Sequence, residues 1–83
     1  MSDIELKVGR TYRAKKPRES HGLVNDRTVL YIGANYVQYD GPAVAHGRHY
    51  PKVLTSDFLK WADRDVTDEL PKNEYAPWPI TKG

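Results

Sequence analysis

The chain has 83 residues, no cysteine, and 13 Lys and Arg against 11 Asp and Glu, for a net charge of +2 at pH 7. This length predicts one domain with a small core, and the lack of cysteine excludes disulfides and thiolate metal sites. No apolar run approaches the roughly 18 residues that span a membrane, and no secretory signal is visible at the N-terminus, so we expect a cytoplasmic protein.

A first strand is predicted from about Arg10 to Lys16. Polar and apolar residues alternate there, which places Tyr12 and Ala14 on one face and Arg13 on the other. Pro17 ends the strand because it has no N–H to donate to a neighbouring strand. Residues 17–27 follow as a long polar loop with several turn-forming residues.

The strongest strand signal is the β-branched and aromatic run from Thr28 to Ile32. Its apolar residues fall on both faces, which indicates a central strand. Alternation divides them into two pairs, Leu30 with Ile32 and Val29 with Tyr31. Residues 33–35 are short enough for a hairpin turn, and a second strand is predicted over residues 36–39.

A loop over residues 41–48 leads to a predicted strand from His49 to Leu54. Pro51 within it indicates an edge position or a bulge. A short helical turn near residues 56–62 follows, for which Thr55 or Ser56 is expected to supply the N-terminal cap. Its Phe58 and Trp61, three residues apart, share one face and are expected to plug the core.

The carboxylates around residues 63–65 are expected to end this helix. Residues 66–70 are a last short element, either a strand or one helical turn. The chain therefore divides into a β domain over residues 1–70 and an extended tail over 71–83 that contains three prolines and no periodic pattern.

The order of these segments resembles that of small SH3-like barrel proteins from phages and bacterial genomes, many of unknown function. The segments that carry the resemblance are Val8-Gly9-Arg10-Thr11-Tyr12, the strand Arg27 to Ile32, Val37 to Gly41, and Phe58-Leu59-Lys60-Trp61. The resemblance implies a mainly β fold, a small SH3-like antiparallel barrel of four to five strands with one short helical turn. It implies a phage or prophage origin as well, but no functional residue.

No catalytic, cofactor or metal site is expected. His46 and His49 flank a glycine loop without the further ligands that zinc needs, and Ser20 beside His21 lacks a third group to orient the imidazole. The carboxylates near residues 63–69 are expected to be solvated rather than to form an acid–base pair. The glycines at 41 and 47 do not have the spacing of a phosphate-binding loop.

The charge distribution suggests a binding surface. Residues 1–60 carry a net charge of +4 and residues 61–83 a net charge of −2. Single-strand nucleic-acid binders combine such cations with aromatic platforms, although lysine and arginine also protect strand edges and strand tyrosines often line cores. The candidate surface consists of basic and aromatic residues: Arg13, Lys15, Lys16, Arg18, Tyr36, Arg48, His49, Tyr50 and Lys52.

The tail is a second candidate for interaction, through Tyr75 and Trp78. Extended aromatic and proline-rich segments dock into aromatic-lined grooves. Three alternatives remain open: Trp78 folds back on its own domain, engages a partner, or is disordered. The sequence thus predicts a non-enzymatic binding module whose partner is a protein or a second copy. The alternatives are a nucleic-acid-binding barrel and a small enzyme that uses a histidine.

Overall fold

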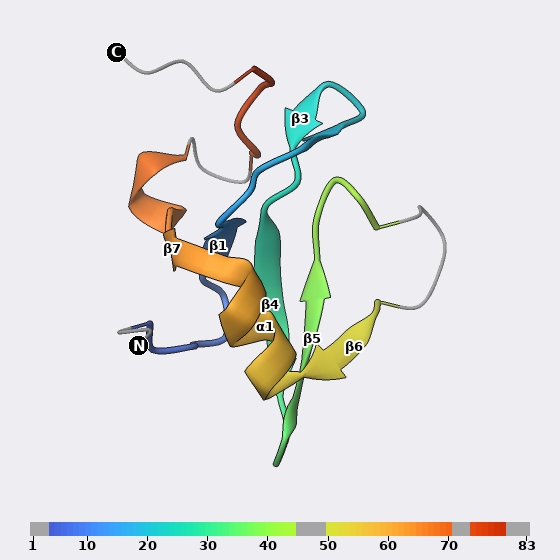
Figure 1. The fold of residues 1–83 in the computed structure, drawn as a ribbon, viewed down its shortest axis with the longest axis vertical. Coiled ribbons are helices and arrows are strands. Elements are labelled where there is room, and N and C mark those ends of the chain that lie inside the picture. The colour runs from blue at the N-terminus through green and yellow to red at the C-terminus, as the bar shows by residue number, and fades with distance from the viewer. Residues whose placement is uncertain (1–3, 45–49, 71–73, 80–83) are drawn as a thin grey trace.

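The computed structural model describes residues 4–44, 50–70 and 74–79, and its main feature is a five-stranded antiparallel sheet (Figure 1). The strand order is β6–β5–β4–β1–β7. These strands are β1 (Thr11–Ala14), β4 (Arg27–Ile32), β5 (Tyr36–Asp40), β6 (Lys52–Leu54) and β7 (Ala62–Asp65). The predicted mainly β class is confirmed. In the described part of the chain, β6 and β7 are the two ends of the sheet and do not pair with each other.

The predicted loop over residues 17–27 contains a small hairpin of its own, β2 (Glu19–Ser20) paired with β3 (Leu23–Val24). His21 and Gly22 connect the two strands with φ angles of 51° and 80°. Two positive φ angles are the signature of the turn that best matches the twist of a tight hairpin. The first strand of the main sheet is correspondingly shorter than predicted and ends at Ala14.

A β-bulge in β4 changes which of its side chains face the core. Val29 pairs with Tyr39 and Tyr31 pairs with Gln38, so that Leu30 is the extra residue. An extra residue reverses the alternation of faces beyond it. Val29 is therefore fully buried and Tyr31 is 52% exposed, and the predicted sharing of a face by these two residues is wrong. The central position of β4 is confirmed.

The core lies between the sheet and α1 (Thr55–Trp61), which crosses in front of the strands in Figure 1. Its fully buried residues are Tyr12, Val29, Val37, Phe58 and Ala62. The Phe58 ring meets the Tyr12 ring edge-on, with centroids 5.7 Å apart and an angle of 88° between planes. Phe58 is thus the core plug that the sequence predicts, and Trp61, with its centroid 5.2 Å from that of Phe58, packs beside it while half-buried.

The start of α1 differs from the prediction. The N-cap residue is Leu54, no side chain caps the helix, and Thr55 lies within its first turn. The Thr55 N–H instead donates to the carbonyl oxygen of Asn35 at 2.9 Å. The turn between β4 and β5 therefore anchors the helix start through its backbone, which removes the need for a hydroxyl cap.

The segments after α1 resolve the remaining alternatives. Residues expected only to end the helix form β7, which pairs with β1 and is the fifth strand of the sheet. The following element is a single helical turn, η1 (Thr67–Glu69), rather than a strand. Pro51 directly precedes β6, whose place at one end of the sheet agrees with the predicted edge position. The predicted strand start at His49 lies outside the described residues.

Candidate functional site

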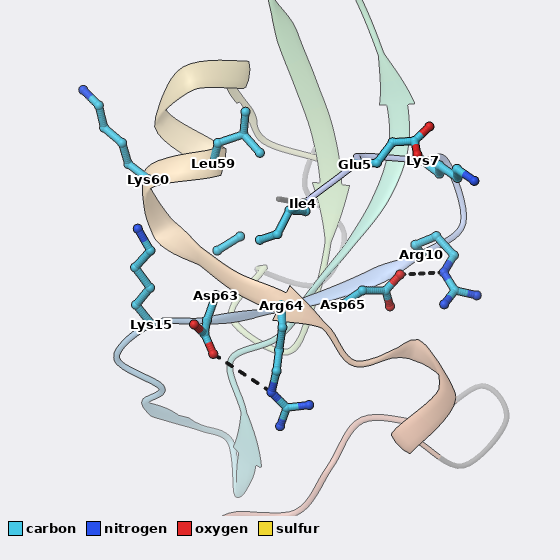
Figure 2. A pocket seen from close by; sticks show the side chains of 11 residues that line it. Ile4, Glu5, Lys7, Arg10, Lys15, Leu59, Lys60, Asp63, Arg64 and Asp65 are labelled. Carbon is cyan, nitrogen blue, oxygen red and sulfur yellow. Dashed lines mark hydrogen bonds and ion pairs between the residues drawn. The ribbon is translucent and has the colours of Figure 1, made fainter. Parts of the chain in front are cut away.

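An open cleft with a volume of about 1000 Å³ lies between the N-terminal arm, residues 4–7, and the end of α1 with β7 (Figure 2). Its apolar part consists of Ile4, Leu59 and Ala62. The arm is held by the hydroxyl of Tyr12, which accepts from the N–H of Lys7 and donates to the carbonyl oxygen of Glu5, both at 2.9 Å. Burial raises the pKa of this tyrosine, so the hydroxyl stays protonated and can donate. We call this feature the basic cleft.

Two arginines of the basic cleft are neutralised by carboxylates of the same chain. Arg10 donates from Nε to Oδ2 of Asp65 at 2.7 Å, and Arg64 contacts Asp63 and Glu69. Burial acts to raise the pKa of Asp65, but the hydrogen bonds from Arg10 and Thr67 outweigh it and the net pKa lies below the usual 3.8. These pairs therefore hold the strand β7 in place rather than offering free charge.

The lysines of the basic cleft carry its unbalanced charge. None of Lys7, Lys15 and Lys60 has an ion pair with a described residue; Lys7 shares the arm with Glu5, and Lys15 and Lys60 come from outside the arm. Both lie on the same side of the cleft in Figure 2, one after the end of β1 and the other near the end of α1. Two exposed ammonium groups beside an apolar floor favour a ligand that is both extended and acidic.

The outer edge of β7 borders the basic cleft. β7 pairs with β1 on one side, and no described strand pairs with its other side. Residues 63–65 of this strand line the cleft. An edge strand presents unpaired N–H and C=O groups that can accept an additional strand.

A second feature, which the sequence did not indicate, surrounds Arg27 at the start of β4. Its guanidinium carbon lies 4.1 Å from the ring centroid of Trp61 and 4.4 Å from that of Tyr39. Desolvation lowers the pKa of Arg27. We call this arrangement the arginine cluster. No local sequence pattern indicates this cluster, because its three residues come from three separate elements, β4, β5 and α1.

The tail folds back on the domain. The N–H of Val24 donates to the carbonyl oxygen of Ala76, and the N–H of Trp78 donates to that of Gly22, both at 2.9 Å. The hydroxyl of Tyr75 is 2.8 Å from that of Thr28 in β4, and burial raises the pKa of this tyrosine. Of the three alternatives for the tail, residues 74–79 therefore adopt the fold-back, with the Trp78 side chain still 39% exposed.

The predicted binding surface is wrong at Arg13, which is buried. The sequence places it on the surface, but it is 7% exposed and forms two hydrogen bonds, at 2.9 and 3.0 Å, with the buried carboxylate of Asp26. Thr11, on the same face of β1, is also 7% exposed, so this face is covered rather than solvated. Asp26 follows the β2–β3 hairpin, and Tyr75 of the tail hydrogen-bonds to Thr28, which in turn hydrogen-bonds to Thr11. Arg13 is therefore part of the structural interior.

The other predicted surface residues fall into two separate groups. Lys15, Lys16 and Arg18 are exposed beyond the end of β1. On the β5–β6 side, the ammonium of Lys52 lies 5.3 Å from the ring centroid of Tyr36. No contact among the described residues joins the two groups. Tyr50 is 46% exposed, whereas Arg48 and His49 lie outside the described residues.

The candidates for chemistry remain isolated. Within residues 4–44, 50–70 and 74–79, no group of three or more His, Asp or Glu side chains could hold a metal ion. His21 is exposed at the turn of the β2–β3 hairpin, and His46 falls outside the described residues. Over the same ranges, no helix is long and apolar enough to cross a membrane.

No protein-family model, no curated protein and no solved structure matches the chain. The functional assignment therefore depends on the chain's own residues and geometry.

Proposed function

We propose that the protein is a non-enzymatic binding module of SH3-like architecture that recognises an extended, acidic protein segment in the basic cleft. The observation that carries this proposal is the combination, in one cleft, of an apolar floor, lysines without carboxylate partners and a strand edge that no other strand covers, all among the described residues.

The connectivity supports the SH3-like part of the proposal. β4, β5 and β6 form an antiparallel meander, α1 follows, and β7 returns to pair with the first strand. In the SH3-like layout that the sequence resembles, a central hairpin is followed by a helical turn that contains a phenylalanine and closes the barrel. Here α1 occupies that place, between β6 and β7, and packs against β5, β6 and β7.

The strand edge supports a protein ligand. A peptide added beside β7 would satisfy the outward N–H and C=O groups of that strand and place alternate side chains over the apolar floor. The tail makes a smaller contact of this kind, an isolated β-bridge between Leu23 and Pro77 with one backbone hydrogen bond on either side. This backbone pairing supports the proposal that the edge of β7 pairs with a segment of a partner.

The charge supports an acidic ligand. Lys15 and Lys60 line the same cleft as residues 63–65 of β7, and neither forms an ion pair with another described residue. Exposed pairs of this kind contribute only about 0.2–1 kcal/mol each. They therefore select acidic over basic partners and increase the association rate more than they raise affinity.

The test is the binding of short labelled peptides, measured by fluorescence anisotropy at low salt. An extended peptide that alternates glutamate with valine is expected to bind more tightly than its lysine counterpart. Lys15→Glu combined with Lys60→Glu is expected to weaken the acidic peptide about tenfold, the equivalent of about 1.4 kcal/mol. Lys52→Glu is the matched control, because Lys52 is exposed, lies against Tyr36 and does not line the basic cleft.

An equal loss of affinity in the Lys52 control, or no preference for the acidic peptide, would contradict the proposal. Light scattering of the same samples at two concentrations distinguishes binding from self-association through the open edges. Self-association that Lys15→Glu and Lys60→Glu leave unchanged would assign the edge to a second copy instead.

Nucleic-acid binding is the second candidate, and the observation that favours it is the exposure of Lys15, Lys16 and Arg18 next to one another in sequence. It is weaker because Arg13 is buried and Arg10 is paired with Asp65. Displaced counterions make such binding fall steeply with salt. A salt titration with mixed oligonucleotides tests it, and no binding at low salt would exclude it.

A further inference from the structure

The guanidinium of Arg27 lies against aromatic rings and has no hydrogen-bond acceptor among the described residues. Its carbon lies 4.1 Å from the ring centroid of Trp61, 4.4 Å from that of Tyr39 and 5.9 Å from that of Phe58. No described residue accepts a hydrogen bond from this side chain or forms an ion pair with it. Stacking therefore restrains the plane of the group while its N–H donors remain unused.

The unused donors face solvent. Among the described residues, no fully buried side-chain nitrogen lacks a hydrogen-bond partner. Because the guanidinium nitrogens of Arg27 have no partner, each must keep some contact with solvent. The guanidinium thus lies over aromatic rings while its N–H donors keep some contact with solvent.

Arg27 differs in this respect from the other partly or fully buried arginines. Arg13 meets both oxygens of Asp26, and Arg10 meets Asp65. Burial is costly for an ion unless a counter-charge compensates it. Desolvation lowers the pKa of Arg27 more than the nearby Tyr39 raises it, and no described carboxylate contributes to this pKa.

We infer that Arg27 is an oxyanion-binding site, at which the guanidinium fork takes two oxygens of a carboxylate or phosphate group supplied by a ligand. A planar fork with parallel N–H donors matches such groups in bidentate fashion, which an ammonium group cannot do. The aromatic rings pre-orient the fork, so the entropy of ordering the side chain has already been lost before the ligand binds. This site does not depend on the basic cleft, whose lining does not include Arg27.

The experiment is NMR of the full-length, ¹⁵N-labelled protein during titration with sodium acetate and, separately, sodium phosphate. Sodium chloride keeps the ionic strength constant. A saturable shift of the Arg27 Nε–H resonance and of the Trp61 indole N–H resonance is expected, with a millimolar dissociation constant. Arg18 is the internal control, because it is an exposed arginine without an ion pair among the described residues.

Each outcome decides the question. A saturable response to acetate alone supports a carboxylate ligand, and a response to phosphate alone supports a phosphoryl group. No saturable shift with either anion overturns the inference, as does a shift of equal size at Arg18, which would show an unspecific effect. These readouts use the unmodified protein, so they do not depend on the folding of a variant.

The variant Arg27→Lys separates the fork from the charge. It keeps a cation beside Trp61 but cannot offer parallel donors. If it folds, as judged from the dispersion of its amide resonances, the anion-dependent shift of the Trp61 indole is expected to fall at least about fivefold. Retention of the full shift would mean that charge alone attracts the anion and would overturn the bidentate assignment. Binding of peptides to the basic cleft should persist in this variant, which keeps the two proposals distinguishable.

Discussion

Replacement of Asp26 by alanine should remove much of the stability of this domain. The Asp26 side chain is 0% exposed and that of Arg13 is 8% exposed. The two are joined by hydrogen bonds of 2.9 and 3.0 Å. Asp26→Ala would leave the guanidinium of Arg13 buried without a counter-charge, and the loss of one partner from a buried pair costs about 3–5 kcal/mol.

That cost is large on the scale of this protein. At about 0.05–0.15 kcal/mol per residue, a chain of 83 residues has a free energy of unfolding of roughly 4–12 kcal/mol. In a domain of this size, each kcal/mol shifts the melting temperature by about 4–8 °C. The variant is therefore expected to melt roughly 12–40 °C below the wild type, or not to fold at all.

A double replacement shows whether the unpaired charge of Arg13 causes the loss of stability in Asp26→Ala. Arg13→Met with Asp26→Leu removes both charges and keeps apolar volume, which in buried pairs is often neutral or stabilising. The double variant should therefore recover most of the stability that Asp26→Ala loses. Asp63→Ala is the control, because Asp63 is exposed and its contact with Arg64 is 4.0 Å long, so a loss below about 0.5 kcal/mol is expected.

Urea unfolding followed by tryptophan fluorescence measures all three variants. The reasoning is refuted if Asp26→Ala loses less than about 1 kcal/mol, the value of an ordinary hydrogen bond. It is also refuted if the double variant is as unstable as Asp26→Ala, since lost packing rather than an unpaired charge would then be responsible.

Three further substitutions test local features. A Cβ at Gly41 would meet the backbone carbonyl oxygen of Asp26, whereas one at Gly33 would meet an aromatic ring that can rotate away. Gly41→Ala should therefore cost about 1–3 kcal/mol in urea unfolding and Gly33→Ala clearly less; equal losses would contradict the geometry. Arg10→Gln should raise the pKa of Asp65 in a carbon-detected NMR titration, because its hydrogen bond lowers that pKa. In the wild type, the ionised Asp65 stabilises the fold above its unfolded pKa, and this stabilisation is lost as the pH falls through the lower folded pKa. The variant should therefore lose less stability on acidification than the wild type. An unchanged pKa of Asp65 would count against the pairing with Arg10.

The elements of the sheet that the sequence predicted are those with strong local patterns. The β-branched run in β4, the short connection at residues 33–35 and the spacing of Phe58 and Trp61 each encode a strand, a turn or a helical face within a few residues. The helix cap was mispredicted, because the backbone of Asn35 replaces the hydroxyl that the local pattern suggested.

The candidate sites were less predictable. Lys15 was correctly placed in an exposed basic segment, but Lys60 was not among the candidates, and the basic cleft exists only because the N-terminal arm lies near α1 and β7. Arg13 was predicted to lie on the surface, but it is buried. Alternation along a strand separates two faces, but it does not say whether a hairpin and a tail will cover the second one.

Local chemistry along the chain was sufficient for the mainly β class and for the strands β4 and β5 with the helix after β6, because backbone propensity, turn formation and the spacing of apolar residues act over a few positions. It was not sufficient for the β2–β3 hairpin or for β7, which were predicted as a loop and as the end of the helix. The orientation of side chains beyond the bulge at Leu30, the pairing of Arg13 with Asp26 and the stacking of Arg27 depended on contacts between distant segments. Such contacts form only when the whole sheet is assembled, since each requires groups from different strands to lose solvent together. For this reason the tertiary structure, and not the order of residues, decides which cations remain available to a ligand.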